Sequence, residues 1–410
     1  MKIGLFAKKN NVSIDTIRHY MDLHLLLPIK ENHQYDFDDR CQKDFEEIQL
    51  LKSMHFTLSE IHTLIDYMRL TAVTTDEYRG YTRKRLEEKR AELEDLLDKT
   101  TQAVQRIEYT INDLSSSNKP AHKMGVSLNL LPLLSCPMCD KDALILESDA
   151  ISNNMIYSGS LHCPCGYHLD ISNGIIIHQE NTIEEYSLDM TMEDYVEQTG
   201  IEVLSNMRKK IGWFEKNIPL ELFDASTVLE IGSGCGFFIR GASAYIDRSK
   251  HYIAIDHDLN RHIFLKSTLE SSNLNLPIHF ICCDFKDIPI KAKSVDILVD
   301  FTGTSNIGFN EPTFLLDHIR PLLKEDCHLL ASYIVFDKFS FNHFLPLENR
   351  KLFIKEDIDM HLEKHNVTVF SSYKGAMQKD GGPYENYFSN DDDVYTICLH
   401  GQLSADHHRG

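Results

Sequence analysis

VLEIGSGCGFF (residues 228–238) is the stretch that decides the fold of the C-terminal half of this chain. A mostly apolar run leads directly into three glycines at alternate positions, Gly232, Gly234 and Gly236. Glycine tolerates a positive φ and lets the backbone approach a ligand closely. The stretch therefore predicts a strand, a tight turn and the start of a helix. A dinucleotide-binding G-x-G-x-x-G motif would need glycine at position 237, where phenylalanine stands.

Further apolar segments around this turn predict an open parallel sheet. Strands are expected at residues 251–256, 278–283, 294–300 and 328–335, with helices between them. The second strand ends in Asp256, and a carboxylate at that place can accept hydrogen bonds from both ribose hydroxyls of a nucleoside. Ligands of such sheets bind at the carboxyl ends of the strands. The glycine spacing favours an adenosine ligand without a pyrophosphate, such as S-adenosylmethionine.

The succession resembles class I S-adenosylmethionine-dependent methyltransferases over about residues 195–400, most closely in DFKDIPIKAKSVDILVD (residues 284–300). The resemblance implies a seven-stranded Rossmann-like domain over residues 179–410. It places Glu230 near the methionine amino group, Asp256 on the ribose and Asp284 on the adenine. The full implied cofactor set is Glu230, Gly232, Ser233, Gly234, Gly236, Asp256, His257, Asp284, Phe285 and Asp300. A similar fold that binds another adenosine ligand is the alternative.

No residue is assigned as catalytic. Methyl transfer from a sulfonium is an in-line displacement that depends mainly on alignment and a dry site. A base is needed only if the acceptor must lose a proton, and the candidates are Asp300, Thr302, Thr304, His257 and Asp258. Motifs for amino-group or cytosine C5 methylation of DNA do not follow the fourth strand. The Gly-rich, aromatic loop at residues 379–393 is expected to cover the site.

The front of the chain, residues 4–27, predicts two short helices joined by a tight turn. Ser13 is a suitable N-cap for the second helix, and Thr16, Arg18 and His19 would project from its first turns. A recognition helix presents side chains to the DNA major groove in this way. The following segment alternates at Tyr35 and Phe37 and predicts a β-hairpin wing. Thr57-Leu-Ser-Glu60 is a capping box that opens another helix.

This order resembles the MerR family of transcription regulators, on IGLFAKKNNVSIDTIRHYMDLHLLLP (residues 3–28) and MHFTLSEIHTLI (residues 54–65). It implies a winged helix-turn-helix over residues 1–75 that binds double-stranded operator DNA. The implied contact residues are Ser13, Thr16, Arg18, His19, Tyr20 and Tyr35. The family often has Arg-Tyr-Tyr where this chain has Arg18-His19-Tyr20, and the wing is rich in acids. The alternative is a helix-turn-helix that serves as a protein interaction module.

Residues 76–116 predict a coiled coil. Leucine, valine and isoleucine recur with a 3.5-residue period between Leu86 and Leu114, and the stretch contains no proline. The resemblance to the MerR family implies that this helix pairs antiparallel with its mate in a homodimer. A long surface helix packed on its own domain is the alternative. Residues 117–134 begin with a polar segment and are interpreted as a linker.

Four cysteines gather in residues 135–178, as Cys136-Pro-Met-Cys139 and Cys163-Pro-Cys165. Two such pairs predict a tetrahedral S₄ zinc site in a small zinc ribbon. The pattern resembles zinc ribbons associated with some methyltransferases, although the second pair is one residue shorter than usual. His162 or His168 is therefore an alternative fourth ligand to Cys165. A degenerate ribbon with free thiols is the other interpretation.

Composition sets the remaining expectations. The 410 residues carry a formal charge of −20, of which residues 1–120 hold 18 basic and 21 acidic side chains. The acidic remainder disfavours a nucleic-acid partner there. No segment suits a membrane helix or a signal peptide, which predicts a cytoplasmic protein without membrane contact. The fold class expected is multidomain, α plus α/β.

Three functions are compatible with these features. The first is a dimeric regulator whose methyltransferase domain senses or methylates a small molecule. The second is an active methyltransferase of a small molecule or RNA that uses its N-terminal domain for autoregulation. The third is a structural regulator that has lost its cofactor, which the intact glycines and acids disfavour.

Overall fold

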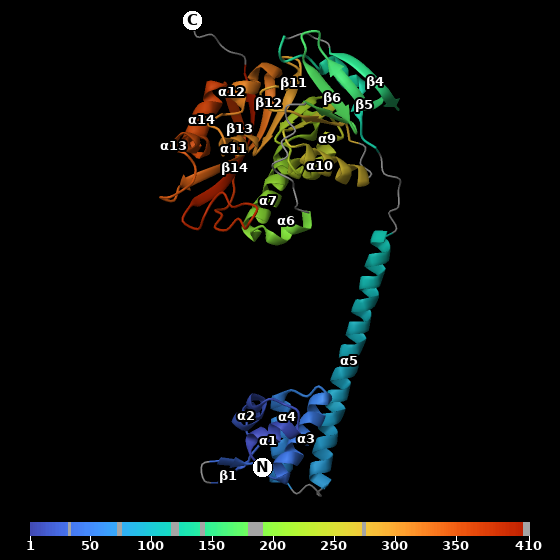
Figure 1. Ribbon diagram of the computed structural model, residues 1–410, viewed down its shortest axis with the longest axis vertical. Coiled ribbons are helices and arrows are strands. Elements are labelled where there is room, and N and C mark those ends of the chain that lie inside the picture. The colour runs from blue at the N-terminus through green and yellow to red at the C-terminus, as the bar shows by residue number, and fades with distance from the viewer. Residues whose placement is uncertain are drawn as a thin grey trace. The chain divides into compact units, whose positions relative to one another are not determined.

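The computed structural model describes residues 1–31, 34–71, 76–115, 123–139, 144–178, 192–272 and 276–404. The chain forms two compact units, Met1–Asn118 and Lys119–Gly410, which are considered separately (Figure 1). No described helix combines the length and apolar character that crossing a bilayer requires.

The first unit is helical, with one small hairpin. Its helices are α1 (Ile3–Lys9), α2 (Ile14–Asp22), α3 (Asp39–Ser53), α4 (Leu58–Leu70) and the 40-residue α5 (Asp76–Ser115). The wing pairs β1 (Ile29–Glu31) with β2 (Gln34–Asp36) in antiparallel register. The two short front helices, the hairpin and the helix after Thr57 are as the sequence predicts.

Capping and burial explain these elements. The Ser13 side chain accepts a hydrogen bond from the backbone N–H of Thr16 and caps α2, and Thr57 and Glu60 form both bonds of a capping box on α4. Lys89, in the fourth turn of α5, lies 2.9 Å from a Glu60 oxygen and over the ring of Phe56. The first turns of α5 therefore pack on α4, and they share one apolar core with α1 to α4.

The second unit is built on one sheet. Its central strands are β8 (Thr227–Ile231), β9 (His251–Asp256), β10 (Ile278–Cys282), β11 (Val295–Phe301), β12 (Leu323–Lys338), β13 (Val367–Lys374) and β14 (Asp393–Leu403). They lie in the order β13-β14-β12-β11-β8-β9-β10, parallel from β10 to β12 and antiparallel from β12 to β13. The predicted seven-stranded Rossmann-like arrangement is confirmed.

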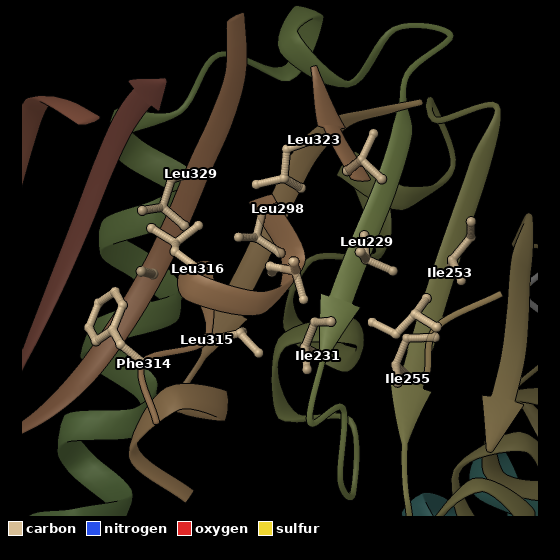
Figure 2. Close-up of a cluster of buried hydrophobic side chains, with 14 of the residues drawn as sticks. Leu229, Ile231, Ile253, Ile255, Leu298, Phe314, Leu315, Leu316, Leu323 and Leu329 are labelled. Carbon is tan, nitrogen blue, oxygen red and sulfur yellow. The ribbon is translucent and has the colours of Figure 1, made fainter. Parts of the chain in front are cut away.

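Helices cover both faces of this sheet. They are α6 (Met192–Gln198), α7 (Ile201–Asn217), α8 (Phe237–Gly241), α9 (Ser243–Ile246), α10 (Leu259–Ser271), α11 (Gly303–Gly308), α12 (Leu316–Ile319), α13 (Leu347–Arg350) and α14 (Lys355–Lys364). Figure 2 shows one apolar layer, in which Leu229 and Ile253 lie on neighbouring strands and Phe314 and Leu316 lie on the side of Leu298 and Leu329. The alternate residues of the strands pack with α7, α8 and α10 on the opposite face.

One expected helix is wrong. The sequence predicts a helix between the strands at residues 294–300 and 328–335, but the described chain forms only the short α11 and α12 there, and β12 already begins at Leu323. The physical reason lies in Pro312 and Pro321, which cannot donate a backbone hydrogen bond and interrupt the helical ladder.

The cysteine-rich segment continues the same sheet. Strand β7 (Ile175–Ile177) pairs in parallel with β10, and β6 (His168–Ser172), β5 (Met155–His162) and β3 (Val126–Ser127) follow outward, with β4 (Ile145–Ser152) also on β5. Residues 123–134 were expected to be linker. They instead contain β3 and a 3₁₀ segment (Leu128–Leu133), because Val126, Leu130 and Leu134 are apolar and fully buried.

A buried histidine pair lies in this sheet. His251 of β9 and His279 of β10 approach with their ring nitrogens 3.2 Å apart. Burial, reinforced by the neighbouring His251, lowers the pKa of His279 to about 3. The unfolded chain takes up this proton near the ordinary histidine pKa, whereas the folded chain does not. The contribution to stability is therefore complete above about pH 6.5 and is lost progressively as the pH falls towards 3.

We expect the His279→Gln substitution to flatten the acid side of the stability profile. The loss in unfolding free energy between about pH 7 and pH 5 should shrink by about 2 kcal/mol, because glutamine takes up no proton. Urea titrations at both pH values measure this change. The exposed His318→Gln variant is the control and should keep the wild-type slope. Equal slopes for His279→Gln and the wild type would contradict the assignment.

Candidate functional site

The turn after β8 depends on three left-handed glycines. Gly232, Gly234 and Gly236 have φ of 71°, 52° and 75°, which side chains with a Cβ rarely adopt. A Cβ on Gly236 would lie 2.3 Å from a methyl carbon of Leu265 in α10. The turn is further held by the Gly232 N–H, which donates to the carbonyl of Ile255 at 2.9 Å. The sequence therefore places bare backbone at the carboxyl end of β8.

Asp256 at the end of β9 supports this turn. Its carboxylate is 2% exposed and accepts hydrogen bonds from the backbone N–H of Gly234 at 2.8 Å and of Asp258 at 3.0 Å. Each oxygen keeps a further lone pair for another donor. His257 follows, with an exposed ring whose Nδ1 lies 3.6 Å from an Asp256 oxygen.

Glu230 lies on the face of β8 that points towards α7. It is 2% exposed and accepts a hydrogen bond from the Tyr252 hydroxyl at 2.9 Å. Burial raises the pKa of its carboxyl group to about 8. The next side chain along the turn, Ser233, has a buried hydroxyl without a hydrogen-bond partner in the described part of the chain. Both groups line a cavity and are available to a polar ligand.

This cavity has a volume of about 1070 Å³ and opens beside the glycine turn. Five of the predicted cofactor residues line it, namely Glu230, Gly232, Ser233, Gly234 and His257. Gly236 and Asp256 lie directly behind that lining and hold it in shape. A single drug-sized ligand occupies roughly 300–1,000 Å³ of pocket, so this space can hold a nucleoside together with part of a second molecule.

The remaining three predicted residues also lie outside the cavity lining. Asp284 accepts a hydrogen bond from the Lys286 N–H at 2.8 Å, and Phe285 packs edge-on against His318. Asp300 is fully buried and accepts hydrogen bonds from the Thr304 N–H at 2.8 Å and its hydroxyl. Burial raises the Asp300 pKa to about 6. Its carboxyl group therefore anchors the start of α11 instead of facing the cavity.

The candidate catalytic bases also divide into residues that line the cavity and residues that do not. Thr302 and His257 line the cavity, whereas Asp258 caps α10 by accepting from the Asn260 N–H at 2.9 Å. Thr304 is engaged with Asp300. Neither Asp258 nor Thr304 lines the cavity, so these two candidates are not placed to touch a ligand there.

Sequence reasoning missed the residues on the other side of the cavity. Tyr195 of α6, Lys210 of α7 and Thr396 of β14 line it, as do Glu385 and Tyr387 of the connection between β13 and β14. That connection was expected to cover the site, and its residues 383–387 do line the cavity. The sequence pattern that could have revealed the α7 residues is a pair of polar residues within the otherwise apolar face of that helix. Asn206 and Lys210 are buried there between Val203 and Phe214.

The four cysteines form one cluster. The ligand sulfurs of Cys136, Cys139, Cys163 and Cys165 all lie within 4.8 Å of one another, with the closest contacts at 3.5 Å. Tetrahedral zinc with bonds of about 2.3 Å separates its sulfurs by about 3.8 Å, so the cluster fits a metal ion. The Tyr167 N–H contacts the Cys165 sulfur and lowers its pKa to about 7, which favours the metal-binding thiolate.

Cys163 and Cys165 therefore both belong to the cluster, although their spacing is one residue shorter than usual. His162 and His168, the alternative ligands, lie outside it. The ring of His162 is 3.9 Å from a Glu147 oxygen, and that of His168 is 3.0 Å from an Asp170 oxygen.

The predicted DNA-contact residues of the first unit divide by exposure. Arg18 and His19 are exposed on α2, Thr16 is partly exposed beside the cap Ser13, and Tyr35 is exposed on the wing with Lys30 near its ring. Tyr20 is a correction, because it is 2% exposed and its hydroxyl accepts a hydrogen bond from Lys52. It follows Ile17 by three residues and so faces the core with it.

Comparison with known proteins agrees with these two units. Residues 1–68 match the family described as MerR HTH family regulatory protein, and residues 229–331 match the family described as methyltransferase domain. No curated protein sequence matches the chain.

Many solved structures are also similar to it. One is a SAM-dependent methyltransferase from Aquifex aeolicus, 14% identical, covering 52% of this chain and 100% of that one, with a TM-score of 0.35. Another is the arsenic(III) S-adenosylmethionine methyltransferase CrArsM from Chlamydomonas reinhardtii, 11% identical, covering 49% and 74%, with a TM-score of 0.35.

We expect Cys165→Ser to weaken zinc binding by more than about a hundredfold, because a thiolate ligand is lost. Competition with a chromogenic chelator measures the affinity, and elemental analysis measures the metal content. His162→Gln is the matched control and should keep the wild-type zinc content. Zinc loss in the His162→Gln protein together with retention in Cys165→Ser would assign the fourth ligand to the histidine.

Proposed function

We propose that this chain, which joins a MerR-type helix-turn-helix domain to a methyltransferase domain through a cysteine-rich ribbon, is a dimeric DNA-binding regulator. Its methyltransferase domain binds S-adenosylmethionine and senses or methylates a small molecule. The observation that carries the cofactor assignment is the glycine turn held by Asp256 beside a cavity large enough for a nucleoside. The ribbon binds zinc through its four cysteines.

The residues at the turn would hold the cofactor by their chemistry. Asp256 keeps lone pairs for ribose hydroxyls, and the buried Glu230 carboxyl can pair with an amino group. Gly232, Ser233 and Gly234 offer backbone and hydroxyl groups at the cavity wall, and His257 lies at its rim. When bound, S-adenosylmethionine supplies an electrophilic methyl group. Asp284 and Phe285 remain proposed adenine contacts on the loop after β10.

We expect Asp256→Asn to weaken S-adenosylhomocysteine binding by about 10- to 100-fold, because an amide oxygen accepts more weakly than a carboxylate. Isothermal titration calorimetry on the full chain measures this. Asp258→Asn is the matched control. Asparagine caps a helix as well as aspartate does, so its affinity should stay at the wild-type value. A wild-type chain that gives no heat would refute the cofactor assignment.

DNA binding and dimerisation are the other half of the proposal. Exposed Arg18, His19 and Tyr35 project from α2 and the wing, where such side chains reach bases and phosphates in this type of domain. Beyond its first turns, α5 exposes Leu97, Val104 and Ile107, and the first and last of these are 68% and 58% exposed. An apolar stripe on a long helix is stabilised when a second helix covers it, so we propose a second copy there.

We expect the double substitution Val104→Glu/Ile107→Glu to convert the dimer into a monomer in light scattering, because two charges would be buried in the seam. Affinity for a duplex selected by the full chain from a random library should fall with it, since two linked domains gain effective concentration. Gln102→Glu/Gln105→Glu adds the same charge outside the seam and should remain dimeric. A monomeric wild-type chain would overturn this part.

The second candidate is an active methyltransferase that uses its N-terminal domain for autoregulation. A cavity with room beyond the nucleoside favours a small-molecule acceptor for this function. The acid-rich remainder of the chain disfavours RNA. The two functions differ in whether cofactor binding is coupled to DNA binding. A sensor must bind operator DNA with a different affinity when S-adenosylhomocysteine is present.

A further inference from the structure

The cavity continues past the glycine turn into a second region, which we call the α7 end. Its wall is made by Tyr195, Lys210, Gln378, Glu385, Tyr387 and Thr396. None of these residues belongs to the predicted cofactor set. They come from α6, α7, β14 and the connection between β13 and β14, and therefore from elements other than the glycine turn.

Lys210 supplies a buried cation or amine at this end. Its side chain is 3% exposed, and its Nζ lies 4.7 Å from the centre of the Phe301 ring, at the end of β11. No carboxylate oxygen among the described residues lies within 4.0 Å of that nitrogen. A buried lysine without a close counter-ion is costly to keep charged.

Glu385 also lines the α7 end and is held by the chain around it. Its carboxyl group accepts a hydrogen bond from the Tyr195 hydroxyl. The connection that carries it is fastened to the helices, because the Gly200 N–H donates to Gly381 and the Lys379 N–H donates to Glu202. These contacts hold the connection beside α7, and the Tyr195 hydroxyl orients the Glu385 carboxyl group.

Burial shifts both groups towards their neutral forms. It lowers the pKa of Lys210 and raises the pKa of Glu385, although each partner's charge acts in the opposite direction. A neutral amine can accept a proton, which an ammonium cannot.

Unsatisfied polar groups show that this end is built for a polar ligand. Gln378 and Thr396 are 2% and 4% exposed, and neither the Gln378 Oε1 nor the Thr396 Oγ1 has a hydrogen-bond partner among the described residues. Buried polar atoms are rarely left unpaired. The surrounding wall is aromatic, with the rings of Phe309 and Tyr387 5.1 Å apart. A flat aromatic molecule with polar substituents suits this combination.

We propose, resting on the function proposed above, that the α7 end binds a small phenolic acceptor and that Lys210 is the base that receives its hydroxyl proton. The Lys210 amine takes that proton, so the O–H bond breaks and an N–H bond forms. The oxygen electron pair forms a bond to the methyl carbon of S-adenosylmethionine. The carbon–sulfur bond breaks, and its electron pair stays on sulfur. The products are a methyl ether, S-adenosylhomocysteine and the Lys210 ammonium ion, which holds the transferred proton.

The test uses the full chain saturated with S-adenosylhomocysteine and 4-nitrophenol as the probe, because only its phenolate absorbs visible light. Below the pH at which the free probe is half ionised, binding to the wild type should raise the phenolate absorbance. Calorimetry in buffers of different ionisation enthalpy should show no proton released to the buffer, because Lys210 retains it. Lys210→Arg should release about one proton per bound phenolate, since its guanidinium cannot accept one.

Lys210→Met should bind the probe at least about tenfold more weakly and without the absorbance rise. Lys209→Met, on the exposed neighbouring position of α7, should match the wild type. Lys210→Met should melt no lower than the wild type, since a buried amine is removed. A lower melting temperature with wild-type probe binding would overturn the proposal in favour of a structural cation–π role. If S-adenosylhomocysteine binds but 4-nitrophenol gives no absorbance change, only this inference fails. Without S-adenosylhomocysteine binding, the proposed function fails as well.

Discussion

The carboxylate of Asp256 and the turn after β8 depend on each other. The Gly234 N–H can reach that carboxylate only because the chain reverses through three left-handed residues without side chains. The same reversal brings α8 against α10 so closely that Leu265 occupies the space of a Cβ on Gly236. The carboxyl ends of β8 and β9 are thereby joined, and the cavity opens beside the glycine residues of the turn.

Local sequence signals predicted this joint and the sheet around it. Apolar strands such as residues 251–256 and 278–283 are short, bounded by turns and buried on both faces, which is the pattern of parallel strands. The capping residues Ser13 and Thr57 predicted helix starts because their hydroxyl groups act within one turn. The cysteine spacing predicted the cluster, since each pair needs only its own turn.

Properties that depend on distant contacts could not be predicted. Lys210 becomes part of the cavity only through the fold of α7 over β11, and Asp300 leaves it because Thr304, four residues on, returns to bind it. Tyr20 resembles an exposed recognition residue in sequence, but the pairing of α2 with α3 buries it. The partner of β7 was equally hidden, because three isoleucines suit any buried strand.

The parallel pairing of β7 with β10 has a consequence for the organisation of the second unit. In a free Rossmann-like sheet, β10 would be an outer strand with a row of open amide and carbonyl groups, which invites association with other chains. Here β7 pairs with Phe280–Cys282 of that row, and β7 belongs to the same segment as the cysteine cluster. The ribbon therefore protects this edge of the sheet. Removing it from the second unit would expose β10 as an unpaired edge strand and promote aggregation.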